Sequence, residues 1–126
     1  MSTAAAIPVP RQLASPTLTK ELWVSLASLL RSHVAMHCVA RPGADLWIVS
    51  SSDAEVVLHG PKGRLRLTAP RACNASTLAF RPLHAVLADE PIQVFFMEDS
   101  SIQFENLDRA LDMEAAVEYL LRKVIG

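Results

Sequence analysis

The sequence contains few cysteines and few glycines, and each shortage excludes a class of protein. Among its 126 residues there are two cysteines, Cys38 and Cys73, at a spacing that fits neither a zinc site nor a redox motif. Small secreted domains are usually rich in disulfides, so we expect two reduced thiols and a cytoplasmic protein. Only four glycines are present, without a GxGxxG or P-loop pattern, so no phosphate-binding loop is predicted.

The start of the chain lacks a targeting signal, and no part of it contains a long apolar run. No Lys or Arg precedes the alanines at 4–6, and Pro8 and Pro10 interrupt any apolar helix there. No uninterrupted apolar run reaches the roughly 18 residues of a membrane span. We therefore predict a flexible tail over residues 1–16, one domain over residues 17–126, and no membrane association.

The chain does contain enough apolar sequence for a core, since 51% of it is hydrophobic and 20% is charged. Two segments place apolar residues on one helical stripe. The first begins at about Pro16, where Ser15 or Thr17 can cap it, and runs to the mid-thirties, where Val34 to Val39 fits either an extension of the helix or the start of a strand. The second runs from Leu107 to Ile125, with Asn106 or Asp112 as its cap. The stripes are Leu22, Leu26, Leu29, Leu30 and His33 in the first helix, and Met113, Val117, Leu120, Leu121 and Val124 in the second.

Between the two helices the hydrophobic period changes to two, which is typical of strands. The turn residues Gly60-Pro61-Lys62-Gly63 predict a hairpin, and Arg64 to Thr68 alternates strictly after them. Strand-forming runs occupy 46–49, 55–59, 64–68, 77–80, 92–97 and 102–105, while 84–87 fits either a strand or a helical turn. The order predicts an α+β two-layer sandwich with an N-terminal helix, an antiparallel meander of about five to seven strands, and a C-terminal amphipathic helix.

Charge is divided unevenly along the chain. Residues 1–81 contain nine Lys and Arg against four Asp and Glu, whereas residues 82–126 contain three against nine. Arg64 and Arg66 share one strand face, about 7 Å apart by the strand rise. The acidic half could meet these arginines within the fold or in a second copy of the chain, and the second possibility predicts a homodimer.

Four histidines are the first candidates for catalysis or metal binding. His33 and His37 are spaced i,i+4, but valine follows His33 where a metalloprotease helix has glutamate. No second cluster of Cys, His or acidic residues completes a site, so we expect no metal and no cofactor. The motifs of nucleophilic catalysis are absent too, which makes an enzyme the less favoured interpretation.

Two predicted strands, Trp47 to Val49 and Ile92 to Met97, are hydrophobic on both faces. Such a strand is either central in a curved sheet or part of an interface with a partner. We predict a small non-catalytic protein-interaction module (accessory, chaperone-like or regulatory) that is homodimeric and binds another protein through its sheet. The predicted interaction residues are Trp47, Arg64, Arg66, Phe95 and Phe96.

In element order, size and acidic C-terminal half, the chain resembles the small dimeric chaperones of bacterial secretion systems, which implies a binding role in general. Two alternatives stay open. A small-molecule or catalytic pocket between helix and sheet would be lined by His59 and His84. Nucleic acid could follow Arg64 and Arg66, although no aromatic residue interleaves with them and a pI of about 6.4 does not favour it.

Overall fold

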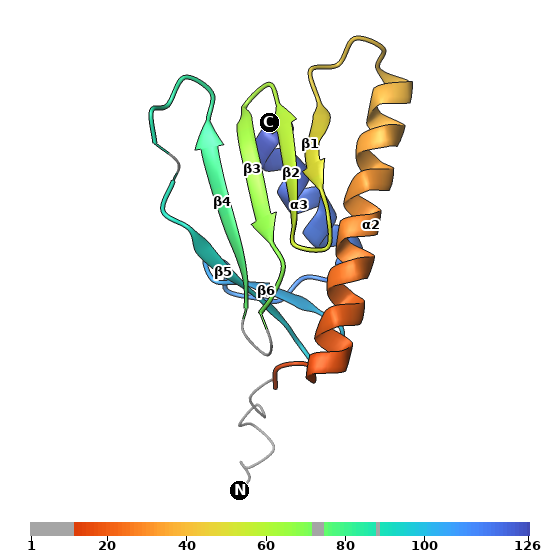
Figure 1. Ribbon diagram of the computed structural model, residues 1–126, viewed down its shortest axis with the longest axis vertical. Coiled ribbons are helices and arrows are strands. Elements are labelled where there is room, and N and C mark those ends of the chain that lie inside the picture. Colours follow the sequence, from red (N-terminus) through yellow and green to blue (C-terminus); the bar gives the residue numbers. More distant parts are fainter. Residues whose placement is uncertain (1–11, 72–74, 88) are drawn as a thin grey trace, which may run out of the picture.

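Two helices and six strands make up the part of the chain that the computed structural model describes, residues 12–71, 75–87 and 89–126. One helix comes first and the other last, with all six strands between them (Figure 1). This order confirms the predicted α+β fold. The elements are α2 (Pro16–Ala40), β1 (Trp47–Ser51), β2 (Glu55–Gly60), β3 (Gly63–Thr68), β4 (Ser76–Pro82), β5 (Ile92–Phe96), β6 (Ile102–Phe104) and α3 (Met113–Ile125).

The strands form one antiparallel meander, in which each strand pairs with the next along the chain. Gly60 pairs with Gly63 across the turn between β2 and β3, as the predicted hairpin requires. The pairing of β1 with β2 is interrupted by a bulge between Ile48 and Ser50. β5 pairs with β4 only over Ser76–Leu78, and beyond that the Phe80 carbonyl of β4 accepts the N–H of Asp89 at 2.6 Å.

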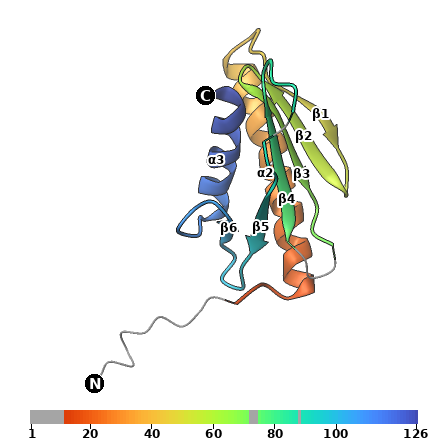
Figure 2. The ribbon, with the colours of Figure 1, turned by 90° about the vertical axis from the view of Figure 1, so that its left-hand side faces the viewer.

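Both helices lie against the same face of the sheet, which we call the inner face. α3 contacts β2 and β3, while α2 contacts β1, β5 and α3. Figure 2 shows α3 on one side of the strands. Figure 1 looks onto the opposite side, where α3 is behind the strands and none of the described elements covers β2, β3 and β4. We call this uncovered side the outer face.

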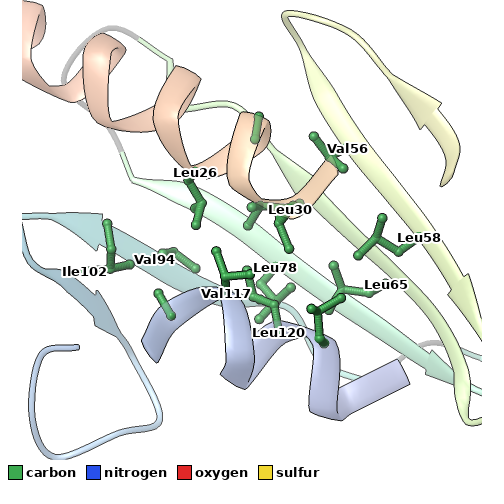
Figure 3. Packing of buried hydrophobic residues seen from close by; sticks show 14 of the residues in the cluster. Leu26, Leu30, Val56, Leu58, Leu65, Leu78, Val94, Ile102, Val117 and Leu120 are labelled. Carbon is green, nitrogen blue, oxygen red and sulfur yellow. The ribbon is translucent and has the colours of Figure 1, made fainter. Parts of the chain in front are cut away.

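The inner face and the two helices enclose the hydrophobic core (Figure 3). Alternation in β2 and β3 points Val56, Leu58, Leu65 and Leu67 inward, and all four are fully buried. The helices meet them with Leu26 and Leu30 from α2 and with Val117, Leu120 and Val124 from α3. Truncating one such leucine to alanine costs about 2–5 kcal/mol, because the transfer energy is lost and a cavity remains.

Helix α2 begins at the predicted cap and ends later than the predicted mid-thirties. The Ser15 hydroxyl oxygen accepts the backbone N–H of Leu18 at 3.2 Å. Toward the other end, Val34 packs into the core, and Cys38, a free thiol, donates to the Leu46 carbonyl at 3.1 Å. These contacts anchor the last turns of the helix, which the alternating apolar and polar residues of that stretch left open.

Helix α2 is also long and apolar enough, by length and composition, to cross a membrane. A share of 33% of its apolar window is buried inside the fold, and helices that pack into a protein core meet the same criterion. One such helix is weak evidence, so the cytoplasmic location stays a prediction.

Helix α3 begins at Met113, six residues after the predicted start. The backbone groups of Leu111 are taken by Ile102 at the edge of the sheet, with N···O distances of 2.7 and 2.8 Å, so this residue cannot join the helix. Asp112 then caps the helix, its carboxylate accepting the N–H of Ala115 at 2.8 Å. The segment before Asp112 therefore pairs with the edge of the sheet and does not continue the helix.

Three further segments complete the comparison with the sequence. Residues 84–87 form neither a strand nor a helical turn, because His84 has a φ of 71° in a turn after β4. Within the predicted tail, Ala14 donates its N–H to the Phe96 carbonyl at 2.8 Å, so the residues just before α2 pack beside β5. Residues 1–11 and Cys73 lie outside the described part of the chain.

The start of α3 can be tested with two aspartates four residues apart. Replacing Asp112 with alanine removes the cap, and we expect the free energy of unfolding to fall by about 1 kcal/mol. Asp108→Ala is the matched control, and it should change little because Asp108 is exposed in the loop before the cap. Urea denaturation followed by circular dichroism measures both variants. A larger loss in Asp108→Ala would instead place the helix start near Leu107.

Candidate interaction surface

The outer face carries basic, polar and aromatic side chains in rows that the strand register defines. Residues paired across neighbouring strands point to the same side of the sheet, so each set of partners forms a row. In β3 the exposed Arg64 and Arg66 alternate with the buried Leu65, which fixes the direction that each row faces. The rows are Trp47, His59, Arg64 and Arg81; then Ser50, Val57, Arg66 and Ala79; then Glu55, Thr68, Thr77 and Gln93.

The first row, which we call the basic–aromatic row, joins an aromatic pair to two arginines. The rings of Trp47 and His59 are stacked, with centroids 4.2 Å apart and planes inclined by 22°. Trp47 nevertheless remains 46% exposed. The Nδ1 atom of His59 is buried without a hydrogen-bond partner among the described residues. The row therefore offers one aromatic surface beside Arg64 and Arg81.

Arg64, Arg66 and Arg81 form what we call the arginine triangle, with Ala79 at the fourth corner of the same square of the sheet. Arg64 lies directly opposite Arg81, and like charges in that position destabilise a sheet. The small Ala79 side chain leaves a depression of about 260 Å³ lined by these four residues. Three cations around an open depression give this part of the outer face a positive potential, which favours an anion.

Few carboxylates neutralise this triangle. All thirteen acidic side chains of the protein lie in the described residues. Of these, Glu55 reaches Arg66, with 3.7 Å between Oε1 and Nε, and none pairs with Arg64 or Arg81. Glu55 belongs to the basic half, so no carboxylate of the acidic half pairs with these three arginines within the described part of the chain.

A second depression on the outer face contains Phe95, which is half-buried there. It measures about 510 Å³ and follows the third row along β3 and β4. Its lining residues are Leu13, Thr68, Ala69, Arg71, Ala75, Thr77, Gln93 and Phe95. The outer face thus continues from the arginine triangle to an aromatic floor, without a covering helix among the described elements.

The structure separates the two neighbouring phenylalanines that the sequence suggested as interaction residues. Phe95 pairs with Gln103 and faces outward, whereas Phe96 pairs with Ile102 and is only 3% exposed. Phe96 is part of the core, because consecutive strand residues point to opposite faces. It cannot serve as a surface anchor, so its assignment to the interaction surface is corrected here. Trp47, Arg64, Arg66 and Phe95 all lie on the outer face.

The histidines are not gathered in one place. His59 is stacked on Trp47 on the outer face, whereas His84 is an exposed residue of the turn after β4. The depressions over the arginine triangle and over Phe95 are lined by neither of them, and the alternative pocket between helix and sheet stays a prediction. His33 instead pairs with Glu114 of α3, with 3.2 Å between Nε2 and Oε2. Within the described ranges no group of three possible metal-ligating side chains occurs.

Exposed apolar side chains also occur away from the sheet. Met36 and Val39 are 66% and 81% exposed near the end of α2, and Val86 and Leu87 are exposed in the loop after β4. A further depression of about 490 Å³ lies beside the first turns of α2, over Trp23. Its charged lining residues, Lys20 and Asp53, form no described cluster with a histidine or cysteine. These regions expose apolar side chains, but their described residues do not indicate which ligand they would bind.

Comparisons of the chain with protein-family models, curated proteins and solved structures gave no match. The interpretation of the outer face therefore rests on its own geometry.

Three features of this surface were not identified from the sequence. The first is the Trp47–His59 stack, which depends on how β1 pairs with β2. The second is the pairing of His59 with Arg64, which the turn at Pro61-Lys62 already determines. Arg81 carries no local signal, because its position opposite Arg64 depends on how β4 pairs with β3.

The like-charge pair in the arginine triangle predicts an unusual response to mutation. Arg81→Glu places a carboxylate opposite Arg64, and we expect the free energy of unfolding to rise by about 0.2–1 kcal/mol. Arg81→Ala, the control, removes the repulsion without adding an attraction and should give a smaller rise. Urea denaturation at low and high salt measures both, and the gain should shrink as salt screens the charges. A loss of stability in Arg81→Glu would contradict this account.

Proposed function

We propose that this chain is a small non-catalytic protein-interaction module that binds its partner through the outer face of its sheet. The observation that carries the proposal is the one-sided packing of the two helices. It leaves Trp47 and the arginine triangle uncovered, on a face where the like charges of Arg64 and Arg81 repel each other. Accessory, chaperone-like and regulatory roles all use such a surface.

The composition of the outer face supports recognition of a protein. Tryptophan and arginine are the residue types most enriched among the side chains that dominate binding energy at interfaces. Here an exposed tryptophan stands in one row with Arg64 and Arg81, held in orientation by its stack on His59. Val57, in the next row, is only 2% exposed although it points outward, so its neighbours already form a packed surface there. A packed, oriented aromatic anchor lowers the entropy cost of binding.

A non-catalytic role is supported by where the candidate groups lie. Acid–base chemistry needs a base within hydrogen-bond reach of the group it serves, and a second residue to orient it. Among the described residues, His59 is stacked on Trp47, His84 is exposed in the turn after β4, and His33 pairs with an exposed glutamate on the helix layer. These positions favour binding over catalysis.

The homodimer stays part of the proposal, but its contact changes. The sequence suggested that the acidic half of one copy meets the arginines of the other, whereas we place the contact on a surface other than the outer face. A symmetric dimer through that face would bring the arginine triangles of the two copies toward each other, and like charges across an interface disfavour it. We therefore expect the outer face to stay free in the dimer. The exposed apolar residues of α2 are a surface without that repulsion.

The dimer can be tested by light scattering after size exclusion. We expect a mass of two chains for the wild type, and the same mass for Trp47→Ala and for Arg64→Glu/Arg81→Glu. Loss of the dimer in these variants would place the contact on the outer face, while a wild-type monomer at high micromolar concentration would remove the dimer from the proposal.

Binding through the outer face can be tested in cells by site-specific photocrosslinking. A photoreactive phenylalanine analogue at position 47 should form an adduct with another protein, identified by mass spectrometry and then titrated in purified form. The matched control places the analogue at Glu118, an exposed position on α3. The adduct at position 47 should disappear in the Arg64→Glu/Arg81→Glu background. Adducts that form only at position 118, with none at position 47, would contradict the proposal.

A further inference from the structure

We infer that the outer face takes an extended acidic segment of another protein, with carboxylates at alternate positions and an apolar side chain nearby. The inference rests on the proposed function and names the chemistry of the partner. The carboxylates would contact the arginine triangle, and the apolar side chain would enter the depression over Phe95.

The spacing of the arginines fits an extended chain. Arg64 and Arg66 are two residues apart on one strand, about 7 Å by the strand rise. Residues i and i+2 of an extended peptide project their side chains to the same side at that same distance. A peptide lying parallel to β3 can therefore place two carboxylates over two arginines at once. Arg81, beside Arg64, widens the site for either carboxylate.

The chemistry of the cations favours carboxylates. The guanidinium group is planar and binds a carboxylate through two parallel N–H···O bonds, which fixes its orientation. Arg66 shares its charge with Glu55 at 3.7 Å, and its side chain stays 61% exposed. A carboxylate that binds Arg66 more strongly can therefore displace Glu55. The Glu55 carboxylate already lies where we expect a carboxylate of the partner to bind.

The two depressions lie along one path on β3 and β4. The arginine triangle is in the first two rows, Thr68 and Thr77 are in the third, and both threonines line the depression over Phe95. A segment that follows this path meets the arginine triangle first and then a largely polar depression, in which Phe95 lies together with Arg71. Trp47 borders the other end of the basic–aromatic row, where it can cover the aliphatic part of the bound segment.

The extent of the basic surface argues against nucleic acid as the occupant. The arginine triangle spans two rows, and the third row contains Glu55 with neutral threonines and Gln93, with Arg71 alone beside it in the second depression. A nucleic-acid strand gains affinity from every phosphate it places on a cation, and this surface offers contacts for only a few. The single exposed tryptophan is already stacked on His59, which leaves one ring face for a base.

The test uses the full chain and defined probes. A short fluorescein-labelled peptide with glutamate at alternate positions, followed by one phenylalanine, is titrated with the protein and followed by anisotropy. Three comparison probes are a peptide of the same composition with its glutamates in one consecutive block, a lysine version of the first peptide, and oligothymidine. A Trp23→Phe variant leaves Trp47 as the only tryptophan, so its fluorescence reports contact on the outer face.

We expect the alternating peptide to bind most tightly of the four probes and to change the Trp47 fluorescence. Arg64→Ala and Arg81→Ala should each weaken its binding about tenfold or more, as the loss of a charge-assisted contact does. Glu55→Gln should tighten binding, because it frees Arg66, and this gain cannot come from a folding defect. Arg122→Ala, on the exposed side of α3, is the control and should leave binding unchanged.

Three outcomes would overturn the inference. They are equal binding of the consecutive-block peptide, tighter binding of oligothymidine with the same loss in the arginine variants, and no effect of Glu55→Gln. The proposed function fails separately, if position 47 gives no protein adduct in cells. An adduct at position 47 together with no binding of the acidic peptide would keep the proposed function and reject this partner chemistry.

Discussion

The burial of one face of the sheet under two helices is the constraint on which the rest of the structure depends. Each strand exposes alternate residues to opposite sides, so once Leu58, Leu65 and Leu67 are committed to the core, the residues between them must face away. A shift of one residue in β3 would move its leucines into water and its arginines into the core. The large cost of that exchange fixes the register, and the register in turn assembles the rows of the outer face.

The arginine triangle is a consequence of this register that folding alone does not favour. Arg64 and Arg81 come from different strands and meet because β3 and β4 must align their inward residues. Their repulsion is small against the burial of the leucines beside them, so the fold tolerates it. A surface of this kind stores unsatisfied charge that an acidic partner can satisfy. Arg81→Glu, which removes the repulsion and should raise the free energy of unfolding, would then weaken the binding of that partner.

Stability and the proposed recognition are divided between the two faces of the sheet. The helices and the inner face supply the stability, including the stripe of α3 that ends with Val124 against the hairpin turn, where the Lys62 N–H donates to the Val124 carbonyl at 2.8 Å. The outer face is the surface on which we propose recognition, and its exposed side chains lie outside the core. Substitutions on it are therefore expected to separate binding from folding more cleanly than substitutions on either helix.

The sequence by itself determined the class of fold, the hairpin of β2 and β3, and the cap of α2, because each depends on residues that are neighbours along the chain. It also placed Trp47, Arg64, Arg66 and Phe95 among the candidate residues. Tertiary structure alone decided that Phe96 belongs to the core, that α3 starts after Leu111, and that Arg81 stands opposite Arg64. Each of these depends on pairing between strands or segments distant in sequence, where backbone hydrogen bonds and burial outweigh local preference.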